Sequence, residues 1–389
     1  MASTTTPNGP VRIGFVGLSS GGWAATAIAP ALLDPEVRKQ FKVVAISTTN
    51  AESAAASATK YSEFFGHEVK AYHGDVEQIL SDPDVDLLAI AVKPEYHRSI
   101  AEKAIAHGKP FFLEWQAGKN VEDTLELARL ANEKGVKSLV GLQGRQTNVI
   151  KKIRNIVESR KIGRLLSVNV NLLFPRSMGI WAPNNIARYA HIVDRSNKVT
   201  LISSAFAHFL EIFLQTLGPL SRVSASGTIL FPTVTIVDDV THEPTGKTLP
   251  NQYPDHITIT GVLKDSGAWV TITIRLGHPS GPGRTELLWE IDGEDGTVKV
   301  EDTRPVGGLL SAHDPEHIHL NGEKLNWITA EDGEAYDNPV PFIKSTWLEF
   351  SKGKENGGHF MDINDAAKHR QVLEAIEASL FEGGRWIDL

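Results

Sequence analysis

The sequence predicts an α/β protein with two domains, the first built on a parallel sheet and the second on a large, mostly antiparallel open sheet. Its 389 residues exceed what one ordinary core holds. Apolar runs alternate with helical segments as far as Arg145, and period-two runs dominate afterwards. We expect residues 1–10 to form a disordered lead-in, residues 11–147 the first domain and residues 148–389 the second.

In the first domain, compact apolar runs are typical of buried parallel strands. The predicted strands are Val11–Gly17, Phe41–Ser47, Asp86–Val92, Pro110–Glu114 and Ser138–Leu142. Helical patterns separate them, at Ala24–Leu33, Ala51–Phe65, Val76–Leu80, Tyr96–His107 and Val121–Lys134. This alternation predicts right-handed βαβ crossovers and a parallel sheet.

The second domain begins with an amphipathic helix, Asn148–Ser159. Alternating runs then predict strands at Leu165–Phe174, Leu220–Thr228, His256–Leu263, Ala268–Leu276, Leu287–Asp292 and Thr297–Glu301. Helices are expected near Leu201–Leu217 and at Asn364–Phe381, and the closing helix is placed to pack back on the first domain. The stretch Pro232–Pro254 lacks a clear period and predicts a long loop, a lid or a contact arm.

Composition excludes several classes of protein. The net charge of -8 and the lack of a basic cluster argue against direct nucleic-acid binding. No cysteine is present, which removes disulfides and thiolate chemistry and fits a reducing compartment. The longest apolar run, near Leu87–Val92, is too short to span a membrane, and Met1–Pro10 lacks a signal-peptide core. We therefore expect a cytoplasmic protein.

The first strand is joined to the first helix by a glycine-rich loop, Gly17-Leu18-Ser19-Ser20-Gly21-Gly22-Trp23. Glycine lets the backbone approach a pyrophosphate, and the helix N-terminus offers free N–H groups to the phosphates. Ser19 replaces the second glycine of the G-x-G-x-x-G pattern. The position of the loop predicts a Rossmann dinucleotide-binding domain, with a plain tight turn as the alternative.

The end of the second strand distinguishes the two nicotinamide dinucleotides. NAD-specific domains usually carry an acidic residue there, which binds the adenosine ribose. This chain has Thr48 and Thr49, with no carboxylate before Glu52. Because hydroxyl groups tolerate a 2′-phosphate better than a carboxylate does, the sequence favours NADP(H) over NAD(H).

The chain resembles the glucose–fructose oxidoreductase and inositol dehydrogenase family over nearly all its length. The motifs that carry this resemblance are the first strand with its loop, residues 90–97, Leu113-Glu114-Trp115, residues 141–145, Ile162-Gly163, the helix with His208 and residues 365–386. Within the family it looks most like the branch of the fungal galactose-regulon repressor. That closer match rests on Gly22-Trp23, residues 112–115, residues 142–145 and residues 206–208.

The resemblance implies a cofactor along the C-terminal edge of the first sheet and a homodimer through the second sheet. Beyond the glycine loop, the expected cofactor-binding residues are Thr48, Thr49, Val92, Lys93, His97, Glu114, Trp115 and Gln143. The residues expected to contact substrate are Trp115, Arg145, Tyr189, Phe206 and His208.

Two departures from the family pattern bear on catalysis. Dehydrogenases of the family have Glu-Lys-Pro where this chain has Glu114-Trp115-Gln116, and that lysine helps to polarise or deprotonate the reacting hydroxyl. Their Asp-x-Gly-x-His stretch corresponds here to Ser204-Ala205-Phe206-Ala207-His208. The histidine is present, while the aspartate and the glycine are replaced. The usual proton relay is therefore incomplete.

Two functions remain open. In the first, the protein is an NAD(P)(H)-dependent reductase of a carbonyl, imine or activated alkene in a small metabolite. His208, with an ordinary pKa near ~6.5, would donate the proton, and Lys93 would replace the missing lysine. In the second, it is a non-catalytic dinucleotide sensor that binds a protein partner.

Each of these residues also has a purely structural interpretation. His208 is equally expected as a satisfied core histidine, Lys93 as a solvated cation and Trp115 as a packing residue. Arg145 is expected either to form a structural ion pair with a carboxylate or to bind the substrate. His313, His317 and His319 are expected on an exposed surface turn, so we predict no metal site.

Overall fold

The computed structural model describes residues 9–281, 283–305, 307–325 and 337–389. The described chain forms two compact units. The first takes the chain as far as Gln146 and again over Asn338–Lys368, and the second takes Thr147–Asp337 and His369–Leu389. Most of the predicted lead-in, residues 1–8, lies outside the described residues.

The first unit contains a six-stranded, wholly parallel sheet in the order β3-β2-β1-β4-β5-β6. Its strands are β1 (Val11–Val16), β2 (Phe41–Thr48), β3 (Lys70–His73), β4 (Leu87–Ile90), β5 (Phe111–Glu114) and β6 (Ser138–Gly141). This is the strand order of a Rossmann fold, with a topological switch point between β1 and β4. The prediction missed β3, a short edge strand whose side chains are mostly exposed and polar.

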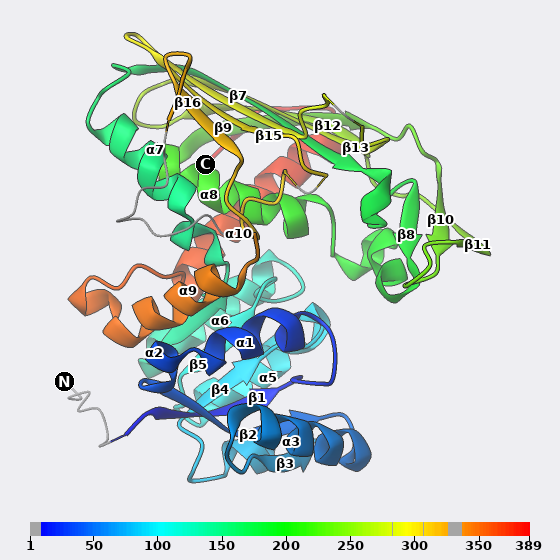
Figure 1. Ribbon diagram of the computed structural model, residues 1–389, viewed down its shortest axis with the longest axis vertical. Helices are drawn as coiled ribbons and strands as arrows, with labels where there is room; N and C mark the ends of the chain where they lie inside the picture. Colours follow the sequence, from blue (N-terminus) through cyan, green and yellow to red (C-terminus); the bar gives the residue numbers. More distant parts are fainter. Residues whose placement is uncertain (1–8, 282, 306, 326–336) are drawn as a thin grey trace. The chain divides into compact units, whose positions relative to one another are not determined.

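Helices cover both faces of this sheet, as Figure 1 shows. They are η1 (Ala24–Ile28), α1 (Ala29–Leu33), α2 (Pro35–Arg38), α3 (Ala51–Phe65), α4 (Glu77–Leu80), α5 (Pro94–Ala106), α6 (Val121–Lys134), η2 (Gln143–Gln146), α9 (Val340–Lys352) and η7 (Lys354–Asn356). Local chemistry sets their ends. Asn50 accepts the Ser53 amide at 2.9 Å to begin α3, and Gly66, with φ of 71°, ends it.

Helix α9 corrects the predicted division of the chain into two contiguous domains. Trp347 is fully buried, and its ring centroid lies 5.1 Å from that of Phe112 on β5. Ile343 and Phe360 join the same core. The segment 338–368 therefore completes the hydrophobic core of the first unit, although it follows every strand of the second unit except β18 (Ile387–Asp388) in sequence.

The second unit contains a nine-stranded mixed sheet in the order β17-β16-β15-β14-β7-β13-β12-β9-β18. Its strands are β7 (Leu165–Pro175), β9 (Leu220–Thr228), β12 (His256–Leu263), β13 (Trp269–His278), β14 (Leu287–Gly293), β15 (Thr297–Asp302), β16 (His317–Leu320), β17 (Glu323–Lys324) and β18 (Ile387–Asp388). Every neighbouring pair is antiparallel except β7 with β13. The predicted mostly antiparallel sheet is confirmed.

In Figure 1, α7 and α8 lie on one face of the nine-stranded sheet. The helices of this unit are α7 (Asn148–Glu158), η3 (Arg176–Met178), η4 (Ala187–Val193), η5 (Arg195–Asn197), η6 (Ile202–Phe206), α8 (Ala207–Leu217) and most of α10 (Ile363–Phe381). The stretch Arg195–Leu217 is long and apolar enough to span a membrane, yet 67% of its most apolar window is buried inside the protein. It packs as a core helix.

The predicted loop Pro232–Pro254 is wrong. This segment forms β10 (Thr233–Val237) and β11 (Pro244–Pro250), and β8 (Asn184–Ile186) completes a small three-stranded sheet. The side chains of β11 are almost all exposed, so no buried face marks it as a strand. Among the described strands it pairs with β10 alone, and β10 in turn pairs with β8, about fifty residues earlier in the chain, which a local pattern does not reveal.

The predicted exposed turn around the histidine trio is also wrong. His317 and His319 lie on β16, paired with β15, and His313 is buried with its Nε2 3.5 Å from Asp302. Among the described residues, no group of three or more His, Asp or Glu side chains is placed to hold a metal ion.

Candidate functional site

A cleft of about 500 Å³ opens at the carboxyl edge of the parallel sheet, beside the β1–β4 switch point. Residues of the glycine loop, the ends of β2 and β3, and helix α5 line it, namely Val16, Gly17, Ser19, Ser47, Thr48, Thr49, Ser53, Gly74, Asp75, Val76, Val92, Tyr96, Ser99, Ile100 and Lys103. Open α/β sheets bind their ligands at this edge and at this switch point.

The glycine loop needs its first glycine. Gly17 has φ of +94°, and a Cβ placed on it would lie 2.3 Å from the Ala91 carbonyl oxygen. By contrast, a Cβ on Gly21 would meet nothing within 4 Å. The loop thus passes close to Ala91, the residue that follows β4, at Gly17, and has open space around it at Gly21. These residues fit a pyrophosphate bound by backbone amides ahead of η1.

Two side chains of α3 hold the loop in place. Tyr61 donates its hydroxyl to the Ser19 carbonyl at 2.8 Å, and Lys60 donates from Nζ to the Ser20 carbonyl at 2.9 Å. Lys60 therefore brings a cation to the glycine loop. Sequence reasoning missed it, because Lys60 is the tenth residue of α3 and far along the chain from the glycine loop.

Hydroxyl groups surround the end of β2, as predicted. Thr48 and Thr49 line the cleft, and Thr48 Oγ1 lies 2.6 Å from Ser53 Oγ. A carboxylate of the cleft lining comes instead from Asp75, which follows β3 and pairs with Lys103 at 2.7 Å. Asp75 and Lys103 were not predicted, because the polar strand β3 that positions them was missed.

Some predicted cofactor residues do not face this cleft. The Leu18 side chain is fully buried in the core, so only its backbone is available to a ligand. His97 is also buried, with Nδ1 2.6 Å from the Gln116 carbonyl and Nε2 2.9 Å from the Val92 carbonyl. It braces two loops at the sheet edge. Lys93 is exposed at the N-cap of α5.

Arg145 adopts the structural arrangement that sequence reasoning had left as an alternative. Its side chain is 6% exposed, and its NH1 group donates to the Phe360 carbonyl at 2.8 Å. The same NH1 lies 3.2 Å from Asp365. These contacts fasten the segment 338–368 to the sheet within the first unit.

Glu114, Trp23 and Gln143 line a second, much smaller cavity in the first unit. A Glu114 oxygen accepts the Trp115 amide at 2.9 Å. Burial raises the pKa of Glu114 to about 7, although this hydrogen bond acts in the opposite direction. Trp115 itself packs against the hydrophobic core.

In the second unit, His208 makes no hydrogen bond to any described residue, and its Nδ1 is enclosed. Burial, and then the neighbouring His369, lower the pKa of His208 to about 4. The expected ordinary pKa near ~6.5 is therefore corrected, and the ring is neutral at physiological pH. A histidine satisfied by the core would have partners for both nitrogens.

The other predicted substrate residues of this unit differ in accessibility. Phe206 is fully buried, its ring centroid 6.2 Å from that of Phe209, so it packs in the core instead of lining a pocket. Ser204, at the position of the family's aspartate, donates its hydroxyl to the Thr200 carbonyl. Tyr189 on η4 is 38% exposed and remains available.

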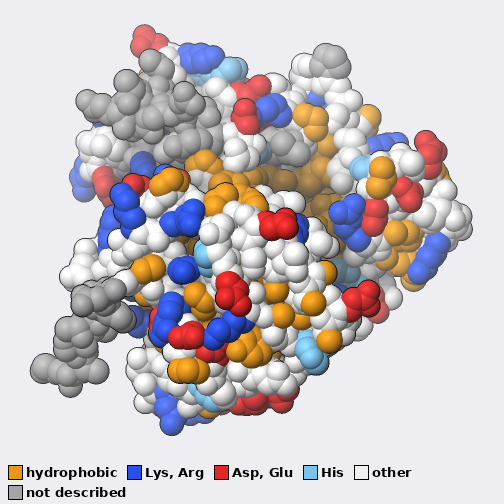
Figure 2. Space-filling model, turned by 60° about the horizontal axis from the view of Figure 1, so that its bottom comes forward, with side chains coloured by type: hydrophobic (Ala, Val, Ile, Leu, Met, Phe, Trp, Pro, Cys, Tyr) orange, Lys and Arg blue, Asp and Glu red, His pale blue; other side chains and the backbone are white. Residues whose placement is uncertain are grey.

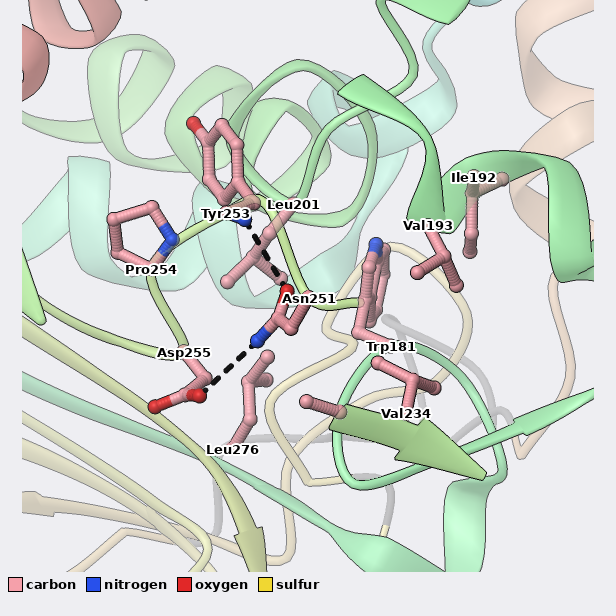
Figure 3. A pocket seen from close by; sticks show the side chains of 11 residues that line it. Trp181, Ile192, Val193, Leu201, Val234, Asn251, Tyr253, Pro254, Asp255 and Leu276 are labelled. Atoms are coloured by element: carbon pink, nitrogen blue, oxygen red, sulfur yellow. Dashed lines mark hydrogen bonds between the residues drawn. The ribbon is translucent and has the colours of Figure 1, made fainter. Parts of the chain in front are cut away.

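A small cavity in the same unit, shown in Figure 3, does not serve as a substrate pocket. Its volume of about 20 Å³ is close to that of one water molecule. Asn251 donates to Asp255 at 3.2 Å, and the Tyr253 amide donates to Asn251, so these polar groups are already paired (Figure 3). The buried indole Nε1 of Trp181, which also lines the cavity, has no hydrogen-bond partner among the described residues.

Two family models match successive parts of the chain. Residues 11–142 match the oxidoreductase family with an NAD-binding Rossmann fold, and residues 148–302 match the C-terminal domain of Gal80p. Over residues 11–142 the chain thus matches this oxidoreductase family. Its second domain is of the Gal80-like kind, so the resemblance inferred from the motifs is confirmed.

Relatives within the family include both enzymes and regulators. The chain is 29% identical to dehydrogenase aclE of Aspergillus oryzae, over 75% of this chain and 76% of the relative. It is 25% identical to the galactose/lactose metabolism regulatory protein GAL80 of Saccharomyces cerevisiae, over 77% of this chain and 68% of the relative.

Solved structures agree with the fold. A super-repressor mutant of Gal80p from Saccharomyces cerevisiae has a TM-score of 0.82 at 21% identity, covering 97% of this chain and 98% of that one. Levoglucosan dehydrogenase, in complex with NADH and L-sorbose, has a TM-score of 0.73 at 18% identity, covering 98% and 99%. At these identities the likeness concerns the fold alone.

Proposed function

We propose that this protein is an NAD(P)(H)-dependent oxidoreductase acting on a small metabolite. The observation that carries the proposal is the 500 Å³ cleft at the carboxyl edge of the Rossmann sheet, with the Gly17 loop beside it. His208 supports the catalytic part, because its buried Nδ1 has no hydrogen-bond partner among the described residues, and such a buried polar group is rare unless it serves a ligand.

The low pKa of His208 changes the expected chemistry. At neutral pH the imidazole is unprotonated, so it accepts a proton more readily than it donates one. A bound nicotinamide dinucleotide supplies the hydride acceptor or donor. In the direction that a neutral His208 supports, the imidazole would accept the hydroxyl proton of an alcohol bound against it. His208 would then take the place of the lysine that dehydrogenases of the family carry at the position of Trp115.

NADP(H) is the cofactor that we propose over NAD(H). The hydroxyls of Thr48 and Thr49 line the adenosine end of the cleft, where no carboxylate of β2 would repel a 2′-phosphate. Lys60 adds a positive charge at the glycine loop. The carboxylate of Asp75 is neutralised by Lys103.

The deciding experiment is a side-by-side fluorescence titration of the full-length protein with NADPH and NADH. Micromolar binding of NADPH, weaker binding of NADH and turnover at 340 nm on small alcohols or carbonyls would support the proposal. Binding of neither dinucleotide by a folded sample would overturn it. Tight binding without turnover on any tested substrate class would favour the regulator described next.

The alternative function is a dinucleotide-dependent regulator that binds a protein partner. Two observations favour it, the tryptophan at position 115 in place of the catalytic lysine and the similarity to GAL80 over 77% of the chain. On the face shown in Figure 2, basic and acidic side chains are interspersed, so a partner for that face would not be chosen by a field of one sign.

A homodimer through the nine-stranded sheet and a cytoplasmic location complete the proposal. Along β13, buried apolar side chains alternate with more exposed ones, among them Thr271, Thr273 and Arg275, so this strand has an accessible face. Light scattering on the purified protein tests the dimer, and a mass of one chain at micromolar concentration would contradict it.

A further inference from the structure

Helix α5 presents one of its faces to the cleft at the carboxyl edge of the first sheet. Tyr96, Ser99, Ile100 and Lys103 line the cleft, and their spacing of three and four residues places them on the same side of the helix. Asp75, in the turn between β3 and α4, lies against this face, because its Oδ1 accepts Lys103 Nζ at 2.7 Å. The Tyr96 side chain is 54% exposed. This part of the cleft thus combines an accessible aromatic ring with an ion pair.

The Asp75 carboxylate is held through one of its two oxygens. Oδ1 accepts the Lys103 ammonium at 2.7 Å and the Glu77 amide at 3.1 Å. In the part of the chain that the structure describes, no donor contacts Oδ2. Because an ammonium group has three hydrogens, Lys103 can donate to a ligand as well as to Asp75. The pair therefore offers an oriented acceptor with a donor beside it.

The other sides of the cleft account for the remaining parts of the proposed cofactor. A pyrophosphate belongs at the Gly17 loop, ahead of η1, and the adenosine ribose belongs at Thr48, where β2 ends. The base is joined to this ribose. The lining that is left for it comes chiefly from the β3–α4 turn and from α5, where Val76 and Ile100 supply apolar surface beside the ion pair.

Resting on the proposed function, we propose that the Asp75–Lys103 pair makes the cleft selective for a dinucleotide whose base is a 6-aminopurine. Adenine carries an amino group that donates and, beside it, a ring nitrogen that accepts. Asp75 Oδ2 accepts the amino group, Lys103 donates to the ring nitrogen, and Tyr96 packs on the face of the base. A 6-oxopurine would instead direct a carbonyl oxygen at the Asp75 carboxylate, and no hydrogen would lie between the two oxygens.

The test compares NADPH with its hypoxanthine analogue, in which an oxygen replaces the amino group of the base. Both are titrated into the full-length protein by calorimetry, with NADH and its hypoxanthine analogue as a second pair. NADPH is expected to bind at least about fivefold more tightly than the analogue, because the analogue loses a hydrogen bond to a charged acceptor. Equal dissociation constants for the two bases would overturn the inference and leave the proposed function intact.

Asp75→Asn separates recognition of the base from a structural role. An asparagine can still accept the Glu77 amide with its side-chain oxygen, but its amide nitrogen is a donor where Asp75 Oδ2 is an acceptor. This donor suits the hypoxanthine oxygen, so the preference for the adenine form is expected to disappear or reverse. A merely structural role would weaken both dinucleotides by the same factor and leave their ratio unchanged, which would contradict the inference.

Glu77→Gln is the matched control. The Glu77 carboxylate lies 3.5 Å from Lys103 Nζ, yet Glu77 does not line the cleft. The variant should therefore keep the wild-type ratio of dissociation constants, and a ratio altered as much as in Asp75→Asn would contradict the assignment to Asp75. Absence of binding of every dinucleotide to the folded wild-type protein would overturn the proposed function as well.

Discussion

At the level of single residues, the glycine loop shows how close packing and ligand binding constrain the same position. Gly17 cannot accept a side chain, because its Cβ would collide with the Ala91 carbonyl and its φ is positive. We expect Gly17→Ala to destabilise the protein by about 2 kcal/mol or more and to abolish dinucleotide binding. Gly21→Ala is the matched control, and urea denaturation with NADPH titration should find it close to wild type.

Thr48 tests the cofactor preference. An aspartate there would break the contact with Ser53 and place a negative charge against a 2′-phosphate. We expect Thr48→Asp to shift the preference toward NADH by at least about tenfold in the ratio of dissociation constants. Thr48→Val removes the hydroxyl without adding charge and should shift it far less. An unchanged ratio in Thr48→Asp would show that the adenosine ribose lies elsewhere.

His208 tests the catalytic assignment. We expect His208→Ala to lower turnover by at least about 100-fold while leaving the dissociation constant for NADPH nearly unchanged. Since burial lowers the pKa of His208 to about 4, its base form is present above that pH and is lost only as the pH falls through it. The wild-type kcat/KM for alcohol oxidation should therefore show no His208 inflection near pH 6.5. Such an inflection, absent from the variant, would contradict this assignment.

At the level of elements, helices with clear ends were predictable and exposed strands were not. Helix α3 spans Ala51–Phe65 and helix α6 spans Val121–Lys134, as predicted. Each helix begins after an asparagine N-cap and ends before a glycine. Strands β3 and β11 have mostly exposed side chains, so their sequences carry no buried face. The candidate site divides in the same way. Thr48 follows a buried strand and was predicted, whereas Asp75 follows β3 and was missed.

Helix α9 is expected to be essential to the stability of the first unit. Trp347 is fully buried, with ring contacts to Phe41 at 5.0 Å and Phe112 at 5.1 Å. We expect Trp347→Ala to lower the free energy of unfolding by about 3–5 kcal/mol, as measured by urea denaturation. Trp386, which is 39% exposed, is the control, and Trp386→Ala should cost about 1 kcal/mol or less. Equal effects would contradict the role given to α9.

At the level of the whole molecule, the nine-stranded sheet is the surface on which the proposed dimer depends. Thr273 of β13 is partly exposed and lies in register with Thr258 of β12 and Asn171 of β7. We expect Thr273→Arg to convert the dimer to a monomer in light scattering, because a large cation would be buried there without a partner. Thr59→Arg, on exposed α3, should leave the dimer intact. A dimeric Thr273→Arg would place the interface on another surface.

The way in which the chain passes between the two units has a consequence for its synthesis. The first unit is closed by residues 338–368, which a ribosome makes only after every strand of the second unit except β18. Until then, the pocket for Trp347 stays open and the nascent N-terminal domain exposes apolar surface. The Rossmann domain thus precedes the second unit along the chain, yet it is among the last parts of the described protein to finish folding.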